Sequence, residues 1–320
     1  MWQLKIADDL LAGNRRALAR AITIVENEAP EKKELLAALY PHTGRAYVIG
    51  ITGSPGAGKS SLVDRLTQHI RKAYGLSVGI IAVDPTSPFS GGALLGDRIR
   101  MQDHVLDEGV FIRSMGTRGS LGGLSRATKE AIKVLDASGK DVILVETVGV
   151  GQSELDIMNA ADSTVVVLTP GAGDIIQTLK AGIMEIADVF AVNKADLEGA
   201  DRTATEVRAM LDLDRERQWR PPVVPVVSLH NTGLDDLYQA IMRHKEYLDS
   251  TGFLTDYRQQ RLKSEVVEVV LERLKQRIGR EFKDSGEFEQ TLEKVINREI
   301  DPYHASDIIL ERMVRGGSVS

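Results

Sequence analysis

The sequence contains no cysteine, and only 5% of its residues are aromatic. The absence of cysteine excludes disulfides, thiolate metal sites, iron–sulfur clusters and cysteine nucleophiles. No apolar run approaches the about 18 residues that a membrane-spanning helix needs, and the first residues, MWQLKIADDLLAG, carry acids where a signal peptide is basic and then apolar. We therefore expect a cytoplasmic protein with no membrane partner, and a mature organelle-matrix protein would share these features.

Neither sign of charge is in large excess. The 40 Lys and Arg residues against 46 Asp and Glu leave a formal charge of −6, which gives no reason to expect a nucleic-acid partner. Hydrophobic residues make up 42% and charged residues 27% of the chain. These are ordinary values for a folded globular protein, so disorder is excluded as the main state.

Three regions follow one another along the chain. Residues 1–44 have apolar side chains at helical spacing, with Asn14 as a plausible N-cap, and form a helical extension. Residues 45–250 alternate helical stretches with short β-branched runs, which predicts an α/β fold with a mostly parallel, doubly wound sheet. The runs are 46–52, 77–83, 110–113, 141–146, 163–169, 189–193 and 223–228. Pro225 lacks an N–H group, so the last strand is expected at or near an edge.

Residues 251–320 are helical again. An apolar stripe from Leu262 to Ile278 lies among many charges, a second stripe includes Phe288 and Leu292, and Asp301-Pro302 opens a last helix. Two interpretations stay open for this region: a helical cap on the core, or an arm that pairs with another subunit.

The strongest motif is a phosphate-binding loop directly after the first strand. It reads Gly53-Ser54-Pro55-Gly56-Ala57-Gly58-Lys59-Ser60, followed by Ser61. Glycines let the backbone wrap around a phosphate chain, with N–H groups pointing inward at the start of a helix. Lys59 supplies a cation to the β- and γ-phosphates, and the Ser60 hydroxyl binds Mg²⁺. The fold is therefore predicted to be a P-loop NTPase.

A second motif, Asn193-Lys194-Ala195-Asp196, follows a later strand and indicates guanine. The Asp196 carboxylate can accept two hydrogen bonds from the guanine edge, whereas adenine presents a mismatched edge. Asn193 can hydrogen-bond on the other side of the base site, and the Lys194 stem can lie along the purine. Ser228-Leu229-His230, after the next strand, falls where GTPases complete the base pocket.

Acidic residues follow the strands where Mg²⁺ and the γ-phosphate would lie. Glu146-Thr147-Val148-Gly149 occupies the place of the Asp-x-x-Gly motif of many GTPases, whose acid holds the Mg²⁺ shell and whose glycine senses the γ-phosphate. Asp84 ends the second strand and Asp97 lies in the following glycine-containing loop. With Ser60, these three acids are the predicted metal ligands. Gln152 is either a water-positioning or a structural residue.

The ordered motifs resemble one family closely. GSPGAGKSSL, AVDPTSPFSGGALLGDRIRM, GTRGSLGGLS, VETVGVGQSE, PGAGDIIQTLKAGIMEIADVFAVNKAD and DPYHASD are similar to segments of the MeaB/ArgK GTPases, chaperones of adenosylcobalamin-dependent acyl-CoA mutases such as methylmalonyl-CoA mutase. The resemblance covers the GTPase domain and both helical flanks. It implies a homodimer joined through the C-terminal arm, and hydrolysis of GTP to GDP, with Mg²⁺, that gates cobalamin loading and protects or reactivates the mutase.

The resemblance also assigns roles to residues. It implies that Asp84, Asp97 and Glu146 form the Mg²⁺ shell, and that residues 171–180 form an extra switch loop in which Gln177 and Lys180 respond to the partner. Lys180 joins Lys59, Asp97, Glu146 and Gly149 in the set expected to carry hydrolysis. The partner is expected to bring the cobalamin, because this chain lacks the Asp-x-His-x-x-Gly signature and Asp103-His104 has the wrong spacing.

Three other functions compete with this interpretation. A signal-recognition GTPase is disfavoured because the sequence has no Met-rich peptide-binding appendage. A kinase or ATPase linked to amino-acid transport is disfavoured by the guanine motif. A nickel-insertion metallochaperone GTPase is disfavoured by the absence of cysteine and the scattering of the 6 histidines.

Overall fold

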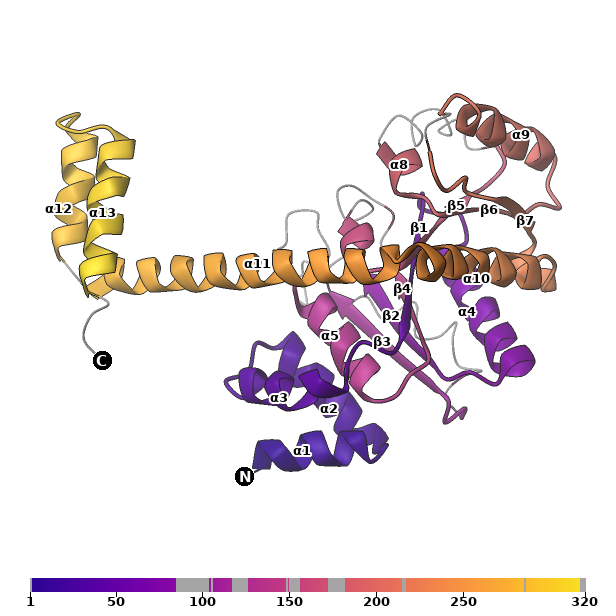
Figure 1. The fold of residues 1–320 in the computed structure, drawn as a ribbon, viewed down its shortest axis with the longest axis horizontal. Coiled ribbons are helices and arrows are strands. Elements are labelled where there is room, and N and C mark those ends of the chain that lie inside the picture. The colour runs from indigo at the N-terminus through magenta and orange to yellow at the C-terminus, as the bar shows by residue number, and fades with distance from the viewer. Residues whose placement is uncertain are drawn as a thin grey trace. The chain divides into compact units, whose positions relative to one another are not determined.

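The computed structural model of the chain describes residues 2–84, 104, 106–116, 126–147, 149, 156–171, 182–214, 217–284 and 286–316. The chain divides into two compact units, Met1–Thr255 and Asp256–Ser320. The first contains the sheet and the N-terminal helices, and the second contains the C-terminal helices (Figure 1). In the part of the chain that is described, no helix combines the length and the apolar character that crossing a membrane requires.

A seven-stranded parallel sheet forms the centre of the first unit (Figure 1). The strands are β1 (Tyr47–Thr52), β2 (Val78–Asp84), β3 (Val110–Gly116), β4 (Val142–Glu146), β5 (Ser163–Leu168), β6 (Val189–Asn193) and β7 (Val223–Val226). Each predicted run forms one of these strands, so the predicted parallel α/β fold is confirmed. Pro225 lies in β7 at one edge of the sheet, as its missing N–H group predicts.

The strand order β3-β2-β4-β1-β5-β6-β7 places β1 between β4 and β5. After β1 the chain builds one side of the sheet through β2, β3 and β4, and then crosses to build the other side through β5, β6 and β7. The carboxyl end of β1 therefore lies where the winding direction changes, which is the place where open parallel sheets bind ligands.

Helices cover both faces of the sheet. On one face, α4 (Lys59–His69) and α10 (Leu234–Thr251) share an apolar cluster with Val165 and Val167 of β5. On the other, α9 (Ala200–Leu211) packs against Val166 and Leu168 of the same strand. On that face α5 (Arg126–Ala137) packs against β2 and β4. This alternation is the period of two that a strand buried on both faces requires. The short helices are η1 (Tyr40–His42), η2 (Ile70–Tyr74), η4 (Ile157–Asn159), α8 (Met184–Ile186) and η6 (Ser228–His230).

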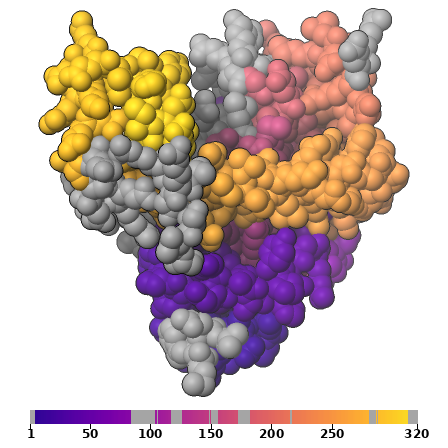
Figure 2. Space-filling view, turned by 60° about the vertical axis from the view of Figure 1, so that its left-hand side comes forward, coloured from indigo at the N-terminus to yellow at the C-terminus, as the bar shows by residue number. Residues whose placement is uncertain are grey.

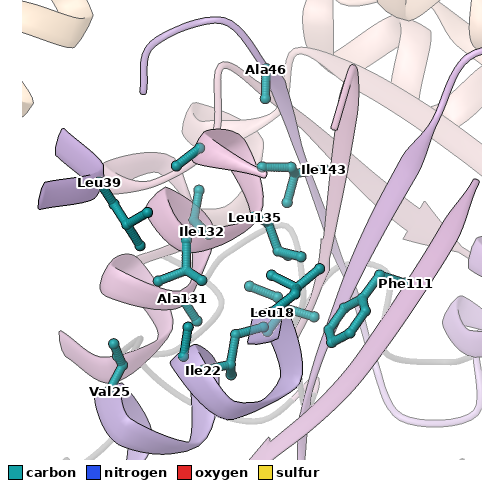
Figure 3. Close-up of a cluster of buried hydrophobic side chains, with 14 of the residues drawn as sticks. Leu18, Ile22, Val25, Leu39, Ala46, Phe111, Ala131, Ile132, Leu135 and Ile143 are labelled. Carbon is teal, nitrogen blue, oxygen red and sulfur yellow. The ribbon is translucent and has the colours of Figure 1, made fainter. Parts of the chain in front are cut away.

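The N-terminal helices α1 (Trp2–Leu11), α2 (Arg15–Glu26) and α3 (Lys32–Leu39) belong to the first unit. Asn14 caps α2, and its Oδ1 accepts hydrogen bonds from the N–H groups of Arg16 at 2.9 Å and Ala17 at 3.1 Å. Figure 3 shows how α2 and α5 bury side chains against each other, among them Leu18, Ile22, Val25, Ala131, Ile132 and Leu135. Charged groups add a buried contact, because Lys32 Nζ lies 2.9 Å from Glu130 Oε2 of α5.

The second unit contains most of α11 (Phe253–Asp284), with α12 (Gly286–Ile296) and α13 (Pro302–Gly316). Asp301 caps α13, where its Oδ1 accepts from the N–H groups of Tyr303 and His304. Helices α12 and α13 lie side by side (Figure 1), and Figure 2 shows the yellow surface that they form. Phe288 of α12 and Ala305 of α13 are buried. The predicted apolar stripe lies on α11, where its members Leu262, Val266, Val270 and Leu274 are exposed, as are the adjacent Val267 and Leu271.

Candidate nucleotide-binding site

The phosphate-binding loop connects β1 to α4 at the carboxyl edge of the sheet. Gly58 ends the loop in the left-handed region, with φ +88°, and precedes the first turn of α4. A Cβ atom at Gly58 would lie 2.3 Å from Nδ2 of Asn193, so this position requires glycine for both its backbone conformation and its surroundings. Within the loop, the Ala57 N–H group donates to the Ser54 carbonyl at 3.2 Å. Ser61 follows in the first turn of α4 and is half-buried.

The Lys59 side chain folds back over the loop that precedes it. Its Nζ donates to the carbonyl oxygens of Gly53 at 2.7 Å and Ser54 at 3.2 Å, and the residue is 6% exposed. Gly149 approaches the same place from the other side, because a Cβ atom there would lie 2.4 Å from Lys59 Nζ and 2.5 Å from the Gly53 oxygen. The phosphate-binding loop and the segment after β4 therefore both lie next to the ammonium group of Lys59.

Two predicted metal ligands meet directly. The Ser60 hydroxyl donates to Glu146 Oε1 at 2.6 Å, and Glu146, the last residue of β4, is 5% exposed. A hydroxyl and a carboxylate side by side form the hard-oxygen donor set that suits Mg²⁺. Asp84 ends β2 in the same sheet, but its side chain and the whole of Asp97 lie outside the described residues. Among the residues that are described, no group of three or more His, Asp or Glu side chains forms a metal cluster.

Asn193 connects the predicted base site to the phosphate-binding loop. Its Nδ2 donates to the Ala57 carbonyl at 2.9 Å, and its Oδ1 accepts from the Ser228 hydroxyl at 2.7 Å and the Ser228 N–H group at 3.3 Å. Both side chains are buried. Lys194, with φ +57°, reaches back so that its Nζ donates to the Gly56 carbonyl at 2.9 Å. Three separate sequence motifs thus form one hydrogen-bonded site.

The other predicted base-site residues follow the buried Asn193 and Ser228 closely in the sequence and lie on the surface. Asp196 is exposed three positions after the buried Asn193. Leu229 and His230 are exposed directly after the buried Ser228. These exposed residues are accessible to a ligand, whereas Asn193 and Ser228 are not. Lys180, Gln177 and Gln152 lie outside the described residues.

The family follows from a comparison of the whole sequence with known families. The profile described as "Methylmalonyl Co-A mutase-associated GTPase MeaB" matches residues 18–283. This match covers most of the chain, including the phosphate-binding loop and the base motif. The chain belongs to the MeaB family.

Individual relatives agree with this assignment. A Pyrococcus abyssi protein is 53% identical over 317 residues, which cover 98% of this chain and 97% of the relative. Escherichia coli "GTPase ArgK" is 37% identical over 278 residues, 83% of this chain and 84% of its own length. Mouse "Methylmalonic aciduria type A homolog, mitochondrial" is 32% identical over 321 residues, 94% of this chain and 77% of its own length.

A solved structure shares the fold. It is described as a LAO/AO transport system kinase, is 28% identical to this chain, covers 97% of each chain and superposes with a TM-score of 0.71. Together with the family match, the P-loop fold identifies this MeaB-family member as a GTPase. The predictions of a GTPase and of a P-loop NTPase fold are confirmed.

One pair of residues in this MeaB-family GTPase was not among the predicted site residues. Thr52 and Thr147 lie at the carboxyl ends of β1 and β4, and the Thr147 hydroxyl donates to the Thr52 hydroxyl at 2.9 Å. Both side chains are buried. The available signal was a threonine at the end of each strand, next to a site motif, but only the register of the two strands brings the hydroxyl groups together.

Proposed function

We propose that this GTPase is a chaperone of an adenosylcobalamin-dependent acyl-CoA mutase, for which it gates cobalamin loading and protects or reactivates the enzyme. The observation that carries the proposal is the match of residues 18–283 to the mutase-associated GTPase family. The name of the mouse relative, which refers to methylmalonic aciduria, supports the same partner. The cobalamin belongs to the mutase in this proposal.

The nucleotide in this proposal is GTP or GDP. It is held by the three motifs that Asn193 connects through hydrogen bonds, namely the phosphate-binding loop, residues 193–196 and residues 228–230. The loop from Gly53 to Ser61 surrounds the phosphates with its N–H groups at the start of α4. Asn193 and Ser228 hold the base pocket in place through their contacts with Ala57 and with each other. Asp196, exposed beside them in the sequence, accepts from the guanine edge, and Lys194, Leu229 and His230 complete the pocket.

Ser60 and Glu146 would hold Mg²⁺, with Asp84 and Asp97 as the further predicted ligands. When bound, Mg²⁺ neutralises charge on the β- and γ-phosphate oxygens. The Ser60 hydroxyl and Glu146 Oε1 lie 2.6 Å apart, which supports their assignment to one Mg²⁺ site.

Lys59 and Gly149 act on the γ-phosphate in this proposal. Lys59 Nζ now donates to two loop carbonyls, and a phosphate chain inside the loop offers it stronger, charged acceptors. Gly149 lies against Lys59, so its backbone N–H group is near the position that the γ-phosphate would take. Free protein then hydrolyses GTP slowly, and the partner accelerates the reaction through the loops that carry Asp97 and Lys180.

The proposed chaperone is a homodimer that pairs through α11. The exposed residues Leu262, Val266, Val270 and Leu274 follow each other at intervals of one helical turn and form an apolar strip. A strip of this kind is more typical of an interface than of a solvated surface.

The experiment that tests this proposal is the GTP hydrolysis rate with and without a purified cobalamin-dependent acyl-CoA mutase. We expect acceleration of at least about tenfold, since a partner that supplies or aligns a cation can contribute more than that. Lys180→Ala is expected to blunt the acceleration, whereas Lys72→Ala, which removes an exposed lysine on η2, is expected to leave it intact. A rate that no such mutase changes would refute the chaperone function and leave the GTPase assignment standing.

A further inference from the structure

The hydroxyl pair of Thr52 and Thr147 joins the carboxyl ends of two strands that both lead into the nucleotide site. Strand register pairs Ile51 with Glu146, so each threonine is the next residue on its strand. The Thr147 N–H group continues the ladder by donating to the Ile51 carbonyl at 3.0 Å. Beyond this point β1 leads into the phosphate-binding loop, and the segment after β4 leads to Gly149, which lies against Lys59 Nζ and the Gly53 carbonyl.

The two threonines lie on the opposite face of the sheet from the predicted metal ligands. Glu146 reaches Ser60 of α4, and side chains alternate along a strand, so Thr147 points away from α4. Gly50, on the same face of β1 as Thr52, lies under Ile157 of η4. The hydroxyl pair therefore leaves the metal and phosphate positions free. It connects the backbones of β1 and β4 on the face of the sheet opposite α4.

Both hydroxyl groups of this contact are buried. Thr52 is 0% exposed and Thr147 is 1% exposed, so water does not substitute for either hydroxyl group. A buried hydroxyl group that loses its hydrogen-bond partner raises the free energy of the folded state. A backbone shift that restores a hydrogen bond lowers it again. Such a shift at residue 147 would move Glu146 on one side and Gly149 on the other.

We propose that Thr52 and Thr147 are positioning residues for GTP hydrolysis, which set the distance between the phosphate-binding loop and the segment from Glu146 to Gly149. They touch neither the nucleotide nor the metal and act through the backbone that carries Lys59, Glu146 and Gly149. The proposal depends on the GTPase activity of this family and not on the mutase partner, so a rate that no mutase changes would leave it intact.

Hydroxyl deletions of nearly equal volume provide the test. Thr52→Val and Thr147→Val are each expected to lower kcat about tenfold, with KM and the affinity for GDP changed by less than about threefold. The double variant is expected to be no slower than either single variant, because each deletion already breaks the same contact. Thr147→Ser, which keeps the hydroxyl group, is expected to retain kcat within about twofold.

Thr67→Val is the matched control. Thr67 is 0% exposed on α4, and its hydroxyl donates to the Val63 carbonyl at 2.7 Å, away from the site. This variant is expected to lower the melting temperature as much as the pair variants do but to keep kcat. A full kcat in folded Thr147→Val would overturn the proposal. So would losses that add in the double variant, or a Thr147→Ser protein as slow as Thr147→Val. If the valine variants do not fold, Thr147→Ser against Thr147→Ala supplies the same comparison.

Discussion

Lys59 is the side chain on which the phosphate site depends most. Its Nζ donates hydrogen bonds to the carbonyl oxygens of Gly53 and Ser54. Gly149, which has no side chain, leaves room for it. We expect Lys59→Ala to lower kcat/KM for GTP by at least about 10²-fold, because it removes the main cation facing the β- and γ-phosphates. Steady-state hydrolysis by a variant with wild-type circular dichroism measures this.

Lys72→Ala is the control for the Lys59 prediction. Lys72 is exposed on η2, so its removal changes the charge of the protein equally without touching the loop. Hydrolysis at the wild-type rate by folded Lys59→Ala would show that this lysine does not face the phosphates.

At the scale of single residues, the sequence predicts local motifs well and contacts between motifs poorly. The phosphate-binding loop and the Asn193 motif are each recognised from a few consecutive residues. The bond from Asn193 to Ala57 and the Thr52–Thr147 pair depend on how β1, β4 and β6 lie in the sheet. No local pattern encodes that arrangement.

Helix α10 is anchored on the sheet by a buried histidine. His244 Nδ1 lies 2.6 Å from the Ser163 hydroxyl of β5, which also contacts the Tyr47 hydroxyl at 2.7 Å. Asp188 Oδ1 lies 3.4 Å from His244 Nε2, and the Trp219 ring packs against the imidazole with centroids 4.9 Å apart. Burial lowers the pKa of His244 from 6.5 to about 4, so the folded protein holds the ring neutral and protonation of the ring destabilises the fold.

This anchor predicts a loss of stability in mild acid. The unfolded chain binds a proton at His244 below about pH 6.5, whereas the folded chain does so only near pH 4. The stabilisation is therefore complete above pH 6.5 and is lost as the pH falls toward 4, by up to about 3 kcal/mol. Urea unfolding at several pH values, for the wild type and His244→Gln, measures it. An equally steep pH dependence in the variant would assign the effect to other groups.

At the scale of helices and strands, composition predicts the elements but not their partners. β-branched runs mark all seven strands, and Pro225 correctly marks an edge. Strand β3 continues to Gly116, three residues past the predicted run, because it pairs with β2 along its whole length. The packing of α2 against α5 rests on shape and burial between distant segments, which helical periodicity alone does not specify.

At the scale of the whole molecule, the exposed apolar strip on α11 predicts that the protein self-associates. We expect the full chain to be a dimer at micromolar concentration in light scattering, and deletion of residues 258–320 to give a monomer. Val270→Glu is a finer test, since it places a charge within the exposed apolar strip. Gln276→Glu adds the same charge at an exposed position on the side of α11 away from Leu274 and is expected to leave the dimer intact. A monomeric full-length protein, or equal behaviour of the two variants, would contradict the assigned interface.

The central claim is that the motifs connected by Asn193 read guanine, and competition binding tests it most directly. Unlabelled GTP, ATP and XTP compete with a fluorescent GDP analogue on the full chain, on Asp196→Asn and on the control Asp201→Asn, an exposed acid of α9. We expect the wild type and the control to prefer GTP. Asp196→Asn is expected to shift toward XTP by at least about tenfold, because the substitution exchanges an acceptor for a donor opposite the base. Equal competition by ATP and GTP in the wild type, or unchanged GTP and XTP affinities in Asp196→Asn, would contradict the guanine assignment.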